Sequence, residues 1–243
     1  MIPHLHPHAG DCEHACCLKI EHLSVHIGGE TILDNIDLHM HCGQMVALIG
    51  PNGSGKTTTI NILNGYLEPV AGECLIFGEN IRTMRPQTRA RIALLLEGHV
   101  QYAFMTIREI ERFYSQYYPR WDARAYYGLM ELLAVAPGQR IARMSCGQRS
   151  QVALGLILAQ NADLMILDDL GTEMITAYST SALYTLINTR LTRAKATIIS
   201  TNCSNEELQK KYTPQILSRI AGEYQTLPFV GRDIRQIKKE REA

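Results

Sequence analysis

The sequence predicts an α/β domain in which a parallel sheet forms the core and helices flank it. Three short, mostly apolar runs are typical of strands buried on both faces: 45–49, 164–167 and 197–200. A glycine-rich loop at 50–55 follows the first run, and a helical pattern begins at Lys56. This alternation of strands and helices is typical of a parallel sheet. The 243 residues are enough for one substantial core of this kind.

The bulk composition is that of a soluble globular protein. Apolar residues make up 46% and charged residues 20%, while Lys+Arg and Asp+Glu balance at 24 each, so no overall charge attracts nucleic acid or anionic lipid. No apolar run approaches the roughly 18 residues of a membrane span, and the start of the chain lacks the pattern of a secretory signal. Seven irregularly spaced cysteines do not indicate a disulfide framework. We therefore expect a cytoplasmic protein with no transmembrane segment of its own.

Residues 1–17 form a biased tail. Its imidazole and thiol side chains are those that zinc prefers: His4, His6, His8, Cys12, His14, Cys16 and Cys17. Their spacing fits no closed zinc motif, so we expect a disordered tail with loose affinity for Zn²⁺. A structural zinc site is the alternative.

The remaining chain, 18–243, is expected to be one domain. Alternating patterns predict strands at 18–21 and 32–38 around a Gly28-Gly29 turn, and further strands follow at 72–78 and 92–96. Residues 105–143 change character, with a helix starting near Thr106, a second helix capped by Asp122, and a concentration of aromatic residues. We expect a helical subdomain inserted at about 98–145. Its aromatic residues are expected to pack in its core, and docking of a partner is the alternative.

Beyond the strand at 164–167, the pattern predicts a helix over 180–193 and a strand at 197–200. Ser204 and Glu207 form a capping box that opens the next helix. A helix over 215–221 and a final strand at 226–230 complete the expected elements.

The loop between the first buried strand and its helix is a complete phosphate-binding motif. Backbone N–H groups of such a loop point at phosphate oxygens, and the helix dipole lies beneath them. Lys56 supplies a charge for the β- and γ-phosphates, and the Thr57 hydroxyl is suited to Mg²⁺. The expected ATP-binding residues here are Gly50, Pro51, Asn52, Gly53, Ser54, Gly55, Lys56, Thr57 and Thr58. The motif predicts Mg²⁺-dependent ATP binding and hydrolysis.

Two adjacent carboxylates follow the second buried strand. Asp168 ends the strand, where its carboxylate can hold the Mg²⁺ opposite Thr57. Asp169 comes next and is expected to polarise the attacking water. A capping or outer-sphere carboxylate is the alternative role for Asp169.

Residues 18–169 resemble ATP-binding subunits of ABC transporters. The phosphate loop and Met144-Ser145-Cys146-Gly147-Gln148 carry this resemblance. It implies an ATPase that energises membrane transport at the inner face of the membrane, with a permease subunit as partner. It also implies a head-to-tail dimer in which Ser145, Gly147 and Gln148 cap the ATP of the opposite subunit. The His/Cys-rich start is similar to metal-uptake ATPases, which implies a metal-ion cargo.

Several positions depart from the ABC pattern. Cys146 replaces the usual glycine, Glu97 replaces a glutamine, and Asn202 stands at the place of the switch histidine. No aromatic residue for stacking on adenine lies near Ile27, where His26 is an imperfect substitute. Asp169 is one methylene shorter than the usual glutamate, which sets its carboxylate about 1.5 Å further back unless the backbone shifts. These departures imply impaired hydrolysis.

Residues 163–239 resemble AAA+ helicase loaders and transposition-helper ATPases. Asn202 matches the first sensor, Arg219 an arginine finger supplied to a neighbouring subunit, and Arg235 a second sensor that acts within its own subunit. Solvated surface charges are the alternative for both arginines. This resemblance implies a chimeric chain and an alternative function as a helicase loader or DNA-associated motor helper. Both families place the sensor strand between the phosphate-loop strand and the strand that ends in Asp168, so both imply the same sheet.

Overall fold

A five-stranded parallel sheet forms the centre of the computed structural model, which describes residues 16–96, 102–132, 134–171 and 177–230. The strand order is β6-β7-β8-β3-β9, and all neighbouring pairs are parallel. The strands are β3 (Met45–Ile49), β6 (Ile92–Leu95), β7 (Leu164–Leu167), β8 (Ala196–Thr201) and β9 (Tyr224–Pro228). Strand β8, which precedes Asn202, lies between β7 and β3, which confirms the expected sheet.

Side chains of this sheet alternate between two hydrophobic cores. On β3, Met45 and Ala47 enter one core, whereas Val46 and Leu48 enter the other. Residues on both faces are almost fully buried, because helices cover one side and a helix with a second sheet covers the other. This double burial explains why the strands are apolar without interruption.

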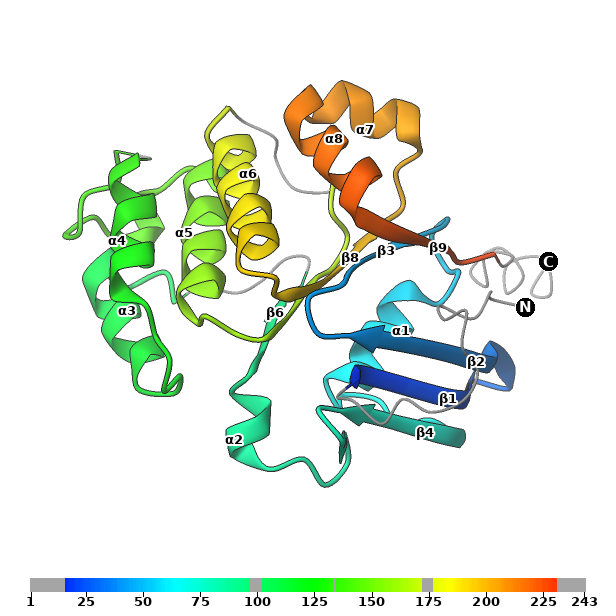
Figure 1. Cartoon of the computed structure of the whole chain (residues 1–243). Helices are drawn as coiled ribbons and strands as arrows, with labels where there is room; N and C mark the ends of the chain where they lie inside the picture. Colours follow the sequence, from blue (N-terminus) through cyan, green and yellow to red (C-terminus); the bar gives the residue numbers. More distant parts are fainter. Residues whose placement is uncertain (1–15, 97–101, 133, 172–176, 231–243) are drawn as a thin grey trace.

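Helices cover the first face of the parallel sheet (Figure 1). Helix α5 (Cys146–Ala159) packs between α4 (Ala123–Leu132) and α6 (Ala177–Thr192), and α3 (Ile107–Ser115) lies beside α4 and α5. Towards the carboxyl end of the chain, α7 (Asn205–Lys211) and α8 (Pro214–Glu223) precede β9. A short 3₁₀ turn, η1 (Ile141–Arg143), leads into α5. None of the helices within the described ranges has the length and apolar character that a membrane crossing requires.

The helices α3, α4 and η1 lie in the segment where we expect a helical subdomain. Asp122 caps the start of α4 by accepting a hydrogen bond from the Ala125 N–H at 3.0 Å, as predicted. Tyr126 is fully buried, and its hydroxyl donates to the Ile107 carbonyl at 3.1 Å. Tyr117, by contrast, remains exposed. Core packing is therefore confirmed for Tyr126 but not for every aromatic residue of this segment.

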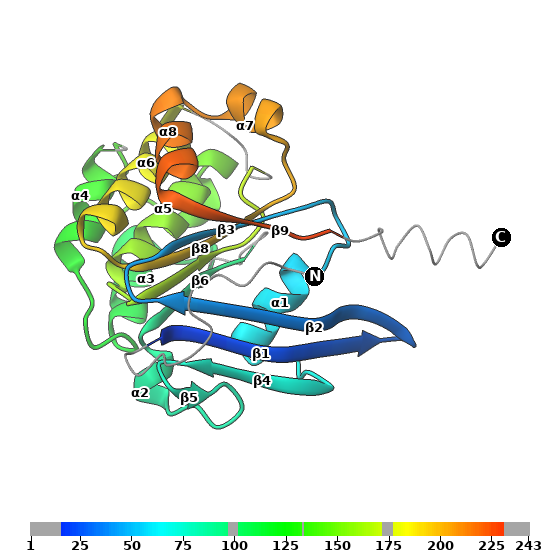
Figure 2. The same ribbon diagram turned by 45° about the vertical axis from the view of Figure 1, so that its right-hand side comes forward.

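The opposite face of the parallel sheet is covered by α1 (Lys56–Leu63) and an antiparallel sheet. In both views α1 lies between the two sheets (Figure 2). The antiparallel order is β2-β1-β4-β5, formed by β1 (Cys16–Ile27), β2 (Glu30–His41), β4 (Ala71–Ile76) and β5 (Glu79–Asn80). The short helix α2 (Pro86–Arg89) leads into β6.

Strand β1 begins inside the segment that we expected to be a disordered tail. Cys16 pairs with His41 of β2, and Cys17 is fully buried, because the strand continues the apolar face of its sheet. Burial raises the pKa of the Cys17 thiol to about 12, which disfavours the thiolate that binds zinc. No group of three or more His, Cys, Asp or Glu side chains in the described ranges is arranged to hold a metal ion. The remaining tail residues, 1–15, lie outside these ranges.

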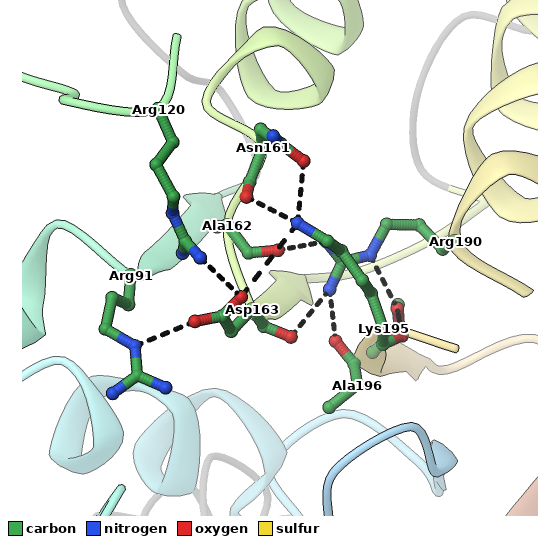
Figure 3. A network of polar contacts seen from close by, with 9 residues as sticks. Arg91, Arg120, Asn161, Ala162, Asp163, Arg190, Lys195 and Ala196 are labelled. Carbon is green, nitrogen blue, oxygen red and sulfur yellow. Dashed lines mark hydrogen bonds and ion pairs between the residues drawn. The ribbon is translucent and has the colours of Figure 1, made fainter. Parts of the chain in front are cut away.

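A polar network joins the helices to the amino ends of β7 and β8 (Figure 3). The Asp163 carboxylate accepts hydrogen bonds from Arg91 at 2.7 Å and Arg120 at 2.8 Å. Burial raises the pKa of Asp163, but these hydrogen bonds outweigh it and hold the pKa below its usual value. Buried Arg190 donates to the Thr197 hydroxyl at 3.1 Å and to backbone carbonyls. Arg120 lies between α3 and α4, so the network attaches this connection to the amino ends of the parallel strands. The phosphate loop lies at the opposite, carboxyl ends of the strands.

Candidate functional site

The carboxyl ends of β3, β7 and β8 meet at one edge of the parallel sheet. Ile49 of β3 pairs with Thr201 of β8, and Leu167 of β7 pairs with Ile199. The residues that follow these strands are therefore brought together: the phosphate loop after β3, the Asp168-Asp169 pair after β7, and Asn202 after β8. This edge is where parallel α/β sheets bind ligands.

Two glycines of the phosphate loop occupy positions that leave no room for a side chain. Phe229 follows β9 and packs against the phosphate loop. A Cβ on Gly50 would lie 2.3 Å from the Phe229 carbonyl oxygen. Gly55 has a φ of +97°, and a Cβ there would lie 2.6 Å from Leu33. Contacts from β9 and β2 thus fix the loop from outside, while its backbone remains available inside for an anion.

Lys56 is buried at the start of α1. Its ammonium group donates to the carbonyls of Gly50 at 2.7 Å and Pro51 at 2.9 Å, so it lies across the loop. Burial lowers the pKa of Lys56, whereas the charges of Asp169 and Asp168 raise it. The cation and the two carboxylates therefore share one partly desolvated site.

The loop fits a phosphate group. The Ser54 hydroxyl is buried and has no hydrogen-bond partner among the described residues. A buried hydroxyl is costly to leave unpaired, so it marks a position for a polar ligand atom. No acidic residue lies in the first turn of α1 to oppose an anion at its positive end.

Asp168 and Thr57 lie side by side, as a shared Mg²⁺ requires. Burial raises the pKa of Asp168, and the neighbouring Asp169 adds to this rise. Hydrogen bonds from the Ser200 and Thr57 hydroxyls lower the pKa of Asp168. One carboxylate and one hydroxyl at this edge are the oxygen ligands that Mg²⁺ takes beside phosphate.

Asn202 connects to the phosphate loop directly. The Asn202 side-chain amide donates to the Asn52 Oδ1 at 2.8 Å, across 150 residues of sequence. Asn202 is half-buried, and its amide lies beside the phosphate loop. An amide in place of a histidine keeps a hydrogen-bonding group here but adds no titratable one.

Ser200 is a site residue that the sequence analysis missed. Its hydroxyl donates to Asp168 Oδ1 at 2.6 Å and accepts from the Asp169 N–H at 2.8 Å. The signal was present, because a serine interrupts an otherwise apolar run at the end of a buried strand. The sequence could not show that β8 lies beside β7, which brings the hydroxyl to Asp168 and Asp169.

The segment 145–148 lies apart from the phosphate loop of its own chain. Ser145 caps α5 by accepting from the Gln148 N–H at 3.2 Å, and Gln148 Oε1 accepts from the Ser145 N–H at 3.1 Å. Ser145 and Cys146 are exposed, whereas Gly147 is buried. Within the described ranges, no hydrogen bond joins these residues to 50–58.

Of the two expected arginines, only Arg219 lies within the described residues. Arg219 is half-exposed on α8 and makes no ion pair with any described residue. Arg235 and Glu97 lie outside the described residues. The geometry therefore brings together Lys56, Thr57, Asp168, Asp169 and Asn202, and their roles remain predictions.

Comparisons with known proteins agree with this geometry. The family model described as ABC transporter matches residues 33–171, more than half of the chain. The Nod factor export ATP-binding protein I of Cupriavidus metallidurans is 29% identical over 147 residues, which cover 58% of this chain and 48% of that protein. The hemin import ATP-binding protein HmuV of Enterobacter cloacae is 31% identical over 146 residues, which cover 58% of this chain and 55% of that protein. The matches thus span about half the length of these relatives.

Solved structures show the same fold. An ATP-binding subunit of an ABC transporter superposes with a TM-score of 0.69 and 25% identity, over 81% of this chain and 83% of that one. An ATP-binding ABC transporter protein from Pyrococcus furiosus gives a TM-score of 0.65 at 25% identity, over 77% of this chain and 92% of that one. The resemblance of residues 163–239 to helicase loaders is not shown by these comparisons. The chain belongs to the ABC transporter family and is an ATP-binding domain of that family, whose ATP-binding domains are ATPases that bind ATP with Mg²⁺.

Proposed function

We propose that this chain binds and hydrolyses Mg-ATP to energise transport through a membrane permease, at the inner face of the membrane. The observation that carries the proposal is the single strand edge that holds the unpaired Ser54 hydroxyl, the buried Lys56 ammonium and the Thr57–Asp168 contact. These groups supply a hydroxyl and a cation for phosphate and two oxygens for Mg²⁺. Belonging to the ABC transporter family supports the transport partner.

Each residue at the edge has a distinct role in this proposal. Lys56 and the loop backbone would bind the phosphates, while Thr57 and Asp168 would hold the Mg²⁺, which would supply positive charge to the transferring phosphoryl group. Asp169 accepts the proton of the attacking water, and Asn202 orients that water. Because Asp169 is short and Asn202 replaces a histidine, we expect turnover to be slow.

The trans-acting part of the site comes from a second copy. The backbone and hydroxyl of 145–147 lie at an exposed helix start, suited to phosphate oxygens from another molecule. A head-to-tail dimer would place this helix start over the phosphate loop of its partner. The half-exposed Arg219 is the competing trans-acting group, and the ABC family match favours Ser145.

A groove between α2, β6 and α3 supports docking of the permease. Its volume is about 550 Å³, and its aromatic lining includes Tyr66, Tyr114, Tyr117 and Tyr118. Tyr66 and Tyr117 are 69% and 62% exposed. Such amphipathic side chains are typical of surfaces that receive a partner protein. The named relatives serve export of Nod factor and import of hemin, so our expectation of a metal-ion cargo rests on the His/Cys-rich start alone.

The proposal is tested by Lys56→Ala and Asp169→Asn. We expect Lys56→Ala to weaken binding of a fluorescent ATP analogue roughly a hundredfold, because the removed charge lies in the loop. We expect Asp169→Asn to retain the analogue while lowering turnover by at least about a hundredfold. Unchanged nucleotide affinity in the lysine variant would exclude the phosphate-loop assignment. Unchanged turnover in the asparagine variant would exclude Asp169 as the base.

A further inference from the structure

Ser200 bonds to the carboxylate of Asp168 and to the backbone of Asp169. It is the penultimate residue of β8, and its side chain is fully buried. Its hydroxyl uses both hydrogen-bonding capacities, donating to Asp168 Oδ1 at 2.6 Å and accepting from the Asp169 N–H at 2.8 Å. Its carbonyl accepts from the Leu170 N–H at 2.7 Å. One residue thus fixes the backbone on which both carboxylates are carried.

Asp169 has an unusual backbone conformation. Its φ is +50°, in the left-handed region that most side chains avoid. Aspartate and asparagine tolerate this region better than longer side chains do. A φ of this sign turns the side chain away from the direction that a strand would give it. The backbone at 169 has therefore departed from the extended path of the strand.

We propose that Ser200 is a positioning residue for hydrolysis: its hydroxyl holds the left-handed turn at Asp169 and orients the carboxylate of Asp168. This inference rests on the proposed function, in which Asp169 is the base and Asp168 the metal ligand. A hydroxyl is required because the position needs one donor and one acceptor on a small side chain. An apolar residue at 200 would fill the space but would release the Asp169 N–H and the Asp168 oxygen.

The first test compares Ser200→Ala with Thr197→Val. Thr197 is the matched control, because it is a fully buried hydroxyl on the same strand that binds Arg190 and Lys195 at the far end. We expect Ser200→Ala to lower kcat roughly tenfold or more, as loss of a group that orients a metal-binding carboxylate does, with the Kd for ATP changed less than about twofold. Thr197→Val is expected to keep the wild-type kcat. We expect Ser200→Thr, which restores the hydroxyl, to recover most of the turnover.

A double-mutant cycle shows whether Ser200 acts through Asp169. Ser200→Ala should lower kcat less in the Asp169→Asn background than in the wild type, because the part of its effect that acts through Asp169 is already lost while the part that acts through Asp168 remains. Full additivity, or a wild-type kcat in Ser200→Ala while Asp169→Asn is slow, would overturn the inference and leave the proposed function intact. A wild-type kcat in Asp169→Asn would overturn both. Where Ser200→Ala does not fold, Ser200→Cys, of nearly the same volume but with a weaker donor, is measured with the same expectation.

Discussion

Single side chains at the strand edge owe their chemistry to their surroundings. Burial lowers the pKa of Lys56 and raises that of Asp168, so burial disfavours the charged form of both. Each is nevertheless placed beside opposite charge, and the Coulomb interaction is stronger there than in water. A phosphate beside Lys56 and an Mg²⁺ beside Asp168 would add further opposite charge to both groups. The cost of burying them is thus offset by the ligand that they bind.

Buried thiols give the protein a predicted alkaline limit. Burial raises the pKa of Cys74 and of Cys17 to about 12, against 9.0 for an unperturbed thiol. Between these two pKa values the buried thiols of the folded protein keep protons that the unfolded chain has lost. Their contribution to the free energy of unfolding is therefore fully present below about pH 9 and decreases as the pH rises. We expect Cys74→Val, which cannot titrate, to lose less unfolding free energy between about pH 8 and pH 10 than the wild type. Urea unfolding under reducing conditions measures both slopes, and equal slopes would contradict the prediction.

Which residues could be predicted depends on how far apart their partners lie in sequence. The residues at 50–57 are contiguous, so their pattern alone indicates a phosphate site. The bonds from Ser200 to Asp168 and Asp169 cross 32 and 31 residues, and they exist only because β8 lies beside β7. Sequence periodicity carries no information about such pairs. The role of Ser200 therefore needed the structure.

At the scale of elements, a helix start with a capping box was predicted better than the end of β1, whereas β3 and β7 match their predicted bounds. The capping box of Ser204 and Glu207 is confirmed, because a cap involves residues only three positions apart. Strand β1 runs to Ile27, well beyond the predicted end at residue 21. His22 interrupts the alternation with a φ of +52°, and the register with β2 and β4 shifts there. A bulge of this kind breaks the alternation of inward and outward side chains, so the period-two pattern no longer indicates that the strand continues.

The same capping principle yields a stability prediction for α3. Thr106 accepts from the Glu109 N–H at 3.2 Å, and Glu109 returns a bond to the Thr106 N–H at 2.7 Å. We expect Thr106→Ala to lower the free energy of unfolding by about 1 kcal/mol, the usual value of such a cap. Thr213→Ala is the matched control, because Thr213 occupies the same position before α8 but makes no capping bond. Chemical denaturation compares them, and equal losses would show that the cap of α3 is not stabilising.

At the scale of the molecule, the site is divided between two surfaces. The phosphate loop, the aspartates and Asn202 converge at one edge of the parallel sheet. Ser145 caps α5 and forms its hydrogen bonds with Gln148, not with the phosphate loop. The parallel sheet and its sensor strand followed from buried runs and motif order in the sequence. The separation of Ser145 from the loop depends on how α5 packs between α4 and α6, which involves contacts that no local pattern contains. A single chain therefore holds half of each proposed catalytic site.

The last prediction concerns which surface completes that site. In a head-to-tail dimer Ser145 faces the partner's ATP, so Ser145→Arg should abolish the rise of specific ATPase activity with protein concentration. Arg219→Ala should keep this rise, because α8 would not enter such an interface. Ser218→Arg introduces the same side chain at an exposed position on α8 and is the matched control. Ser145→Arg also removes the cap of α5, which should lower the free energy of unfolding by about 1 kcal/mol. Thermal unfolding of each variant distinguishes this loss of stability from a loss of dimer-dependent activity. If only Arg219→Ala loses the concentration dependence, the trans-acting group is the arginine, and a ring-forming assembly replaces the dimer.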